Sequence, residues 1–164
     1  MRRNELAVTD FVQKLAVLER CDVMRIGFLP CADEKTPYIV PVHFGLATEG
    51  EALTIYFHGA KEGRKINCYR ENSFVSFEAD RLIDTFGKKK ACSWTADFES
   101  VMGEGQLRML ESVDEKTAAL NAIMAHYNFP GRPEYSEKML DMTAAFALDV
   151  SEWVAKVKIN KRDA

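Results

Sequence analysis

Apolar residues recur along six short segments of the chain in the pattern of β-strands with one buried face. The expected strands cover residues 21–29, 38–44, 51–57, 73–79, 98–110 and 144–159. The turn-forming residues 48–51 join the second and third strands into a hairpin. Gly103 and Gly105 lie within the fifth strand, where we expect a bulge or a close backbone approach.

Helical segments are expected between these strands. Thr9 or Asp10 can cap a helix that runs to about residue 20, because apolar residues recur there on one face. The run from Ser112 to Glu115 fits a capping box for a helix that reaches residue 126, and a short helix is expected over 136–140. Residues 80–97 lack a clear period and predict an extended loop, in which Lys88-Lys89-Lys90 forms a solvated basic turn.

This order of elements predicts a mainly β protein, an antiparallel β-barrel with α-helical decorations and about six strands. A chain of 164 residues suits one domain, and no repeat or low-complexity tract divides residues 1–164. Proline cannot donate a hydrogen bond within a sheet, so Pro41 predicts an edge strand or a strand with a ligand along its backbone.

Composition excludes several classes of partner. With 22 Lys plus Arg against 25 Asp plus Glu, a general nucleic-acid surface is not expected. Neither an apolar leader after Arg2-Arg3 nor a membrane span is recognisable, so we expect a cytoplasmic protein. The four cysteines are far apart without metal-ligand spacing, which predicts free thiols and no metal.

The stretch from Tyr56 to Tyr69 combines a strand end, a glycine-containing loop and a helix start. Arg64 and Lys65 fall in the first turn of that helix. Unpaired backbone N–H groups, the helix dipole and an arginine fork together can hold a phosphate. A solvated basic turn is the alternative interpretation of the same residues.

Five short motifs in this order resemble the flavin-binding split-barrel superfamily of the pyridoxamine phosphate oxidases. The closest likeness is to its branch of nitroimidazole-resistance (Nim-type) flavoproteins. The motifs are Met1-Arg2-Arg3, Pro37-Tyr38-Ile39-Val40-Pro41-Val42-His43-Phe44, Ile55-Tyr56-Phe57-His58-Gly59-Ala60, Gly63-Arg64-Lys65 and Ser100-Val101-Met102-Gly103-Glu104-Gly105.

The resemblance implies a homodimer with FMN in each of two clefts at the interface. It implies that Arg64 and Lys65 hold the FMN phosphate and that Phe57 and His58 lie beside the cofactor. It further implies that residues 39–44, among them Val40, Pro41, Val42 and His43, line the flavin ring largely through backbone groups. Ser100 is carried over from the same resemblance as a further cofactor contact. Two roles are open for Trp94. It lines the flavin or substrate pocket across the dimer interface, or it packs its own loop against the core.

No catalytic residue is assigned, and His58 and His43 are the candidates. Imidazole titrates near neutral pH, so either could tune the flavin potential or relay a proton. His126, on a helix, is expected to be structural, and Trp153 is expected in the core.

The first functional hypothesis is an FMN-dependent, nitroreductase-like oxidoreductase that passes electrons from a reduced nicotinamide or another donor to a small-molecule substrate. A nitro compound is one candidate acceptor. The alternatives are a non-catalytic flavin carrier and a haem-handling relative that uses His43, His58 or His126 as an axial ligand. The substrate clamp of true pyridoxamine phosphate oxidases is not recognisable after Trp153, so vitamin B6 oxidation is disfavoured. Arg64 stands where some Nim-type proteins have a histidine, so chemistry that depends on that histidine is not expected.

Overall fold

The computed structural model describes residues 3–31 and 34–160, so Met1 and Arg2 of the first motif lie outside the described residues. One antiparallel sheet dominates, in the order β3-β2-β6-β7-β8-β5-β4, with the short β1 paired to β8. Its strands are β1 (Ala7–Val8), β2 (Met24–Phe28), β3 (Tyr38–Val42), β4 (Phe44–Glu49), β5 (Ala52–Ala60), β6 (Phe74–Phe86), β7 (Thr95–Leu110) and β8 (Thr143–Lys158). The mainly β, antiparallel prediction is confirmed, but the count of six strands is wrong because the described residues form eight.

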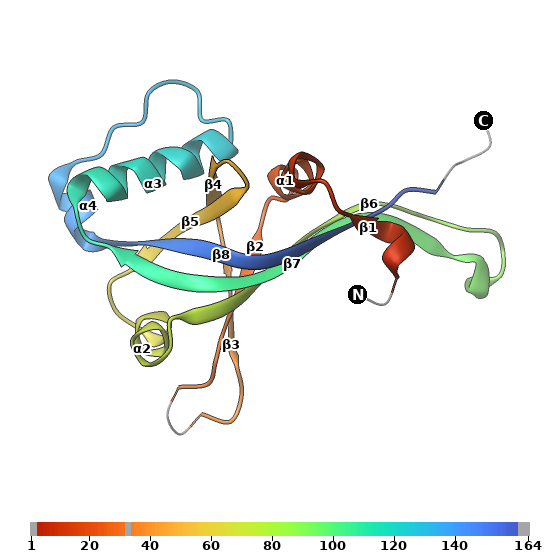
Figure 1. Cartoon of the computed structure of the whole chain (residues 1–164), viewed down its shortest axis with the longest axis horizontal. Helices are drawn as coiled ribbons and strands as arrows, with labels where there is room; N and C mark the ends of the chain where they lie inside the picture. The colour runs from red at the N-terminus through yellow and green to blue at the C-terminus, as the bar shows by residue number, and fades with distance from the viewer. Residues whose placement is uncertain (1–2, 32–33, 161–164) are drawn as a thin grey trace.

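Four α-helices lie around the sheet (Figure 1). They are α1 (Phe11–Glu19), α2 (Arg64–Glu71), α3 (Val113–His126) and α4 (Glu137–Met142), and the 3-10 turns are η1 (Asn4–Leu6) and η2 (Ala91–Ser93). Asp10 caps α1 by accepting from the backbone N–H of Gln13, and Ser112 with Glu115 forms the expected capping box of α3. None of the helices in the described part of the chain is both long and apolar enough to cross a membrane.

The second expected strand is divided at His43. β3 pairs with β2 at one end of the sheet, whereas β4 pairs with β5 at the other end. Since His43 alone separates Val42 from Phe44, the two ends of the sheet must meet there and the sheet curves round into a barrel. Pro41 therefore lies in an edge strand, as its missing N–H predicted.

The barrel interior is filled by apolar side chains that alternate along the strands. Phe44, Phe57 and Phe146 are all fully buried, and the rings of Phe57 and Phe146 stack with their centroids 5.1 Å apart. The hairpin of β4 and β5 turns at Gly50, as predicted. A register shift between Glu104 and Gly105 confirms the expected bulge in β7.

The prediction of an extended loop over 80–97 is wrong. β6 continues to Phe86, which pairs with Thr95 at the start of β7, so the two strands form a long arm. The arm projects from the barrel and carries η2 at its tip (Figure 1). The sequence concealed it because the apolar alternation fails there: the buried positions of the arm include the acidic Asp97, whereas the apolar Leu82 and Ile83 are exposed and the register shifts between Leu82 and Asp84.

Candidate functional site

The N-terminus of α2 offers backbone donors without a side-chain cap. Gly63 occupies the N-cap position with a φ of +106°, a conformation that favours glycine, and no described side chain caps this helix. The N–H groups of Ile66 and Asn67 both donate to the carbonyl of Gly63. The helix dipole and the preceding N–H groups are thus available to an anion, as the glycine-containing loop predicted.

Arg64 already binds an acidic group in this structure. Its Nη2 and Nε donate to Oε2 of Glu34 at 2.6 Å and 3.2 Å, and its guanidinium lies 4.6 Å from the centroid of the Tyr38 ring. The hydrogen bond to Glu34 raises the pKa of Arg64. The carboxylate of Glu34 therefore stands where a phosphate oxygen would be expected to accept from the same fork.

Lys65 lies half-buried on the inner side of Arg64. Its Nζ is 3.5 Å from the carbonyl oxygen of His58 and 5.6 Å from the centroid of the Phe57 ring. Desolvation lowers the pKa of Lys65. A Cβ on Gly59 would clash with the Lys65 ammonium, so the glycine leaves the space that this lysine occupies.

His43 and His58 lie across neighbouring strands. The ladder of β4 and β5 pairs Phe44 with Phe57, so the next position along places His43 opposite His58. Both phenylalanines point into the core and both histidines are exposed, as alternation requires. Desolvation, with the positive charges of Lys65 and His43, lowers the pKa of His58.

Tyr127 of the α3 terminus supports the junction that carries His43. Its hydroxyl donates to the carbonyl of Asp22 at 2.6 Å and accepts from the backbone N–H of Phe44 at 3.3 Å. The rings of His43 and Tyr127 meet edge to face with centroids 5.1 Å apart. The sequence offered no signal for this contact, because residues 43 and 127 are joined only by the fold.

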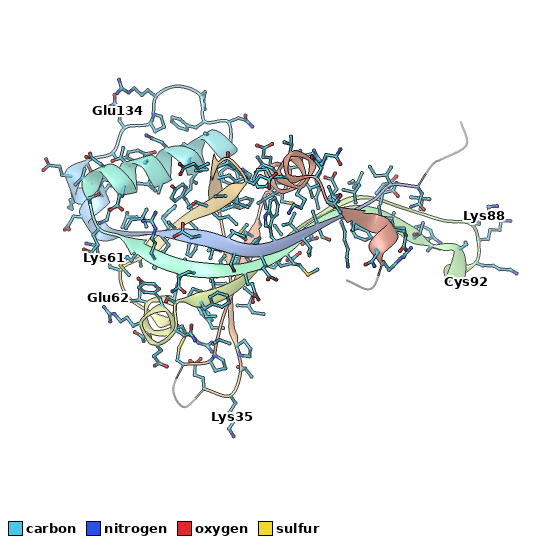
Figure 2. The ribbon with its side chains drawn as sticks, viewed as in Figure 1. Lys35, Lys61, Glu62, Lys88, Cys92 and Glu134 are labelled. Carbon is cyan, nitrogen blue, oxygen red and sulfur yellow. A yellow bond between two sulfur atoms is a disulfide. The ribbon has the colours of Figure 1, made fainter. Side chains whose placement is uncertain are left out.

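The remaining predicted contacts divide into two groups. In the barrel, Val40 is half-buried, Pro41 exposed and Val42 buried, while the side chain of Phe57 belongs to the core and leaves only its backbone for a ligand. Trp94 is 59% exposed and lies immediately before β7, next to the arm tip that Cys92 marks in Figure 2. The same figure places Lys61 and Glu62, which precede α2, at the opposite end of the molecule. Ser100 lies between these ends, paired with Asp80 and Lys156. One chain therefore does not bring Trp94 to the α2 residues.

The expectation of four free thiols is wrong. Cys31 and Cys68 form a disulfide, while Cys21 and Cys92 are free. Sequence spacing could not reveal the pair, because 37 positions separate the two cysteines and the fold brings the segment after β2 onto α2. Glu34, three residues after Cys31, was missed for the same reason.

His126 was expected to be structural and Trp153 to lie in the core, and the structure places both residues in packing contacts of this kind. Nε2 of His126 lies 2.9 Å from the carbonyl oxygen of Cys21, and its ring packs against Phe44 with centroids 4.3 Å apart. Trp153 packs edge to face against Phe11 and is half-buried rather than fully buried. Neither residue belongs to the site around α2.

These donors fit the phosphate end of a flavin nucleotide. Arg64, Lys65 and the α2 N-terminus supply two positive charges and free N–H groups within one turn. The exposed edge of β3 lies beside these donors, because β3 contacts α2. His58 lies in β5, the strand that precedes α2, and His43 lies opposite His58. A flat ring could lie along this edge and find backbone partners there.

Solved structures with the same fold include flavoproteins. The chain aligns with a candidate 5-nitroimidazole antibiotic resistance protein from Bacteroides thetaiotaomicron at 26% identity and a TM-score of 0.77, over 93% of this chain and 86% of that one. It also aligns with the flavocytochrome Anf3 from Azotobacter vinelandii at 21% identity and a TM-score of 0.78, over 98% and 72% of the two chains. An FAD- and heme-binding protein from Mycobacterium smegmatis aligns at 16% identity and a TM-score of 0.79, over 96% and 76%. The predicted split-barrel fold is thereby confirmed.

Comparison by sequence points to the same group. No curated protein matches the chain. The family model described as pyridoxamine 5'-phosphate oxidase matches residues 13–157, which include every strand from β2 to β7 and nearly all of β8. The chain belongs to the pyridoxamine 5'-phosphate oxidase family.

Proposed function

We propose that the protein binds FMN and uses it as an oxidoreductase. The observation that carries the proposal is the convergence of Arg64, Lys65 and the uncapped α2 N-terminus beside His58. An FMN phosphate is close to doubly charged and terminal, so it matches two cations and free N–H groups. The kinship with a candidate nitroimidazole-resistance protein and with structures described as FAD-binding supports a flavin.

The residues of β3 would hold the flavin ring. Val40 and Pro41 belong to an edge strand, and among the described strands β3 pairs only with β2, so its other backbone edge is open there. The bound flavin would supply the electron chemistry, passing electrons from a reduced nicotinamide or another donor to a small acceptor such as a nitro compound. The protein would position both partners and hold protons near the ring.

His58 is the residue best placed to hold such a proton. Its lowered pKa keeps the imidazole neutral at pH 7, so one ring nitrogen can donate while the other accepts. His43, which lies opposite His58 across the β4–β5 pairing, would share this role. The pairing of the two exposed imidazoles supports their candidacy, and the side chain of Phe57 takes no part because it is buried.

We further propose that two chains form the functional unit. Ile39, Met102 and Val154 are exposed apolar residues that line a hollow of about 630 Å³ on the outer face of β3, β7 and β8. An apolar face of this kind is typical of a protein interface. A second chain there would cover it, and the partner chain could bring its own Trp94, at the arm, and its own Ser100, in β7, to the flavin.

Binding of the cofactor tests the central proposal. Purified protein titrated with FMN should quench flavin fluorescence with a micromolar or lower Kd, and FAD should compete less well. Replacing Arg64 and Lys65 with Ala should weaken FMN much more than riboflavin, which lacks the phosphate. Equal losses for the two ligands would refute the phosphate role.

The same preparation tests the reaction and the assembly. Anaerobic reduction by a nicotinamide followed by reoxidation with a nitro compound is expected of an oxidoreductase, whereas bound flavin without turnover would make the protein a carrier. A Soret band in place of flavin absorption would favour the haem alternative. Sedimentation should give a dimer that Met102→Lys weakens.

A further inference from the structure

Two links join α2 to the segment that follows β2. The first is the disulfide between Cys31 and Cys68, whose Cα atoms are 5.1 Å apart. The second is the ion pair between Glu34 and Arg64, at 2.6 Å. Arg64 and Cys68 are four positions apart on one helix and therefore share a face. The covalent link and the ionic link thus lie side by side.

The disulfide also determines where the Glu34 carboxylate lies. The backbone N–H of Glu34 donates to the carbonyl oxygen of Cys31 at 2.9 Å, so a hydrogen bond ties the two residues together. With Cys31 bonded to Cys68, that hydrogen bond keeps Glu34 beside α2, where its carboxylate accepts from Arg64, four positions before Cys68. The disulfide therefore keeps the Glu34 carboxylate close to the Arg64 guanidinium. The effective concentration of the carboxylate at Arg64 is high.

Glu34 uses the donors that a phosphate needs. Nη2 and Nε are the two groups on one side of the guanidinium fork, and both donate to the same carboxylate oxygen. A phosphate that engages this side must displace the carboxylate. Glu34 therefore competes with any anion at the α2 N-terminus for as long as it stays beside Arg64.

We propose that the Cys31–Cys68 pair is a redox modification site that controls phosphate binding by Arg64, an inference that rests on the proposed FMN site. In the disulfide form Glu34 occupies Arg64 and FMN binds weakly. An external dithiol reduces the bond: the S–S bond breaks, each cysteine sulfur gains one hydrogen from the dithiol, and the dithiol becomes a disulfide. Without the covalent link Glu34 leaves Arg64, and the guanidinium becomes free for the phosphate.

The sulfur atoms differ in access. Cys31 is half-buried and Cys68 is only 2% exposed, so an incoming thiolate reaches Cys31 first. Once reduced, the two sulfurs and the Glu34 carboxylate would form a set of potential metal ligands, which lie within 4.8 Å of one another. The test therefore includes a chelator, so that a captured metal cannot imitate the effect of the disulfide.

The experiment measures FMN affinity of the full chain in both redox states. A Cys92→Ser background removes the exposed free thiol, and Cys21 is buried. Protein reduced with dithiothreitol and freed of it without air should bind FMN roughly tenfold more tightly than the oxidised protein, since one charge-assisted bidentate contact is regained. Riboflavin should bind equally to the two forms. Glu34→Gln should give the oxidised protein the affinity of the reduced one.

Two outcomes would overturn the redox inference, and the second of them would also overturn the proposed function. FMN binding with equal affinity in the two states, or tighter binding to the oxidised protein, overturns the redox inference and leaves the FMN site standing. Failure of FMN to bind in either state overturns the proposed function and the inference with it. A Cys31→Ser/Cys68→Ser double variant should match the reduced protein, and if it does not fold, the dithiothreitol comparison decides by itself.

Discussion

The ammonium group of Lys65 occupies the space that a side chain on Gly59 would fill. The two residues belong to α2 and β5, and the contact brings the lysine within 3.5 Å of the carbonyl of His58. The position of this positive charge thus depends on a glycine in a strand, six residues earlier in the chain.

Replacing Gly59 with Val should weaken FMN binding by about tenfold or more, because the displaced Lys65 loses a charge-assisted contact with the phosphate. Fluorescence titration with FMN and riboflavin measures the effect. Ala60→Val changes the next, exposed position of β5 and is the matched control. Unchanged FMN affinity in Gly59→Val would contradict the role of Lys65.

The imidazole of His58 should titrate below pH 6.5, because desolvation and the charges of Lys65 and His43 lower its pKa. The folded protein then binds fewer protons here than the unfolded chain. Its contribution to stability is complete above pH 6.5 and is lost as the pH falls through the lowered pKa. Proton NMR of the ring follows the titration.

Lys65→Met provides the control for this titration. It removes one of the charges that lower the pKa of His58, so the midpoint should move upward, toward 6.5. A midpoint that stays in place would mean that Lys65 does not act on His58 and that desolvation and His43 account for the shift.

Reaction with a thiol reagent should separate the cysteines into three classes: exposed, buried and disulfide-bonded. Cys92 is exposed and should react at pH 8, whereas burial raises the pKa of the Cys21 thiol to about 12 and keeps it unreactive in the folded protein. Denaturation without reductant should add Cys21 alone, and denaturation with reductant should release Cys31 and Cys68. Four reactive thiols in unreduced, denatured protein would exclude the disulfide.

Phe57→Leu should lower the free energy of unfolding by roughly 1–2 kcal/mol without changing FMN affinity, because the ring packs on Phe146 in the core. Chemical denaturation and flavin titration measure the two quantities. A selective loss of FMN affinity in a protein of normal stability would instead indicate that the Phe57 ring contacts the cofactor.

Local chemistry was sufficient to predict much of the fold. The capping residues Asp10 and Ser112 start α1 and α3 where expected, because a cap depends only on residues within one turn. The arm over 80–97 was missed because its apolar Leu82 and Ile83 are exposed while a buried position holds Asp97, so burial there does not appear as an apolar alternation. His43 could not be identified as the junction of β3 and β4, since strand pairing depends on residues distant in sequence.

The sequence by itself determined the barrel class, the family motifs and the placement of two basic residues, Arg64 and Lys65, in the first turn of a helix. Those features depend on residue type and on neighbours within a few positions. Only the tertiary structure decided that Glu34 binds Arg64, that Cys31 bonds to Cys68 and that Gly59 makes room for Lys65. Each of these contacts joins two different elements of the fold, and the packing of the barrel, which no local pattern records, sets which elements meet.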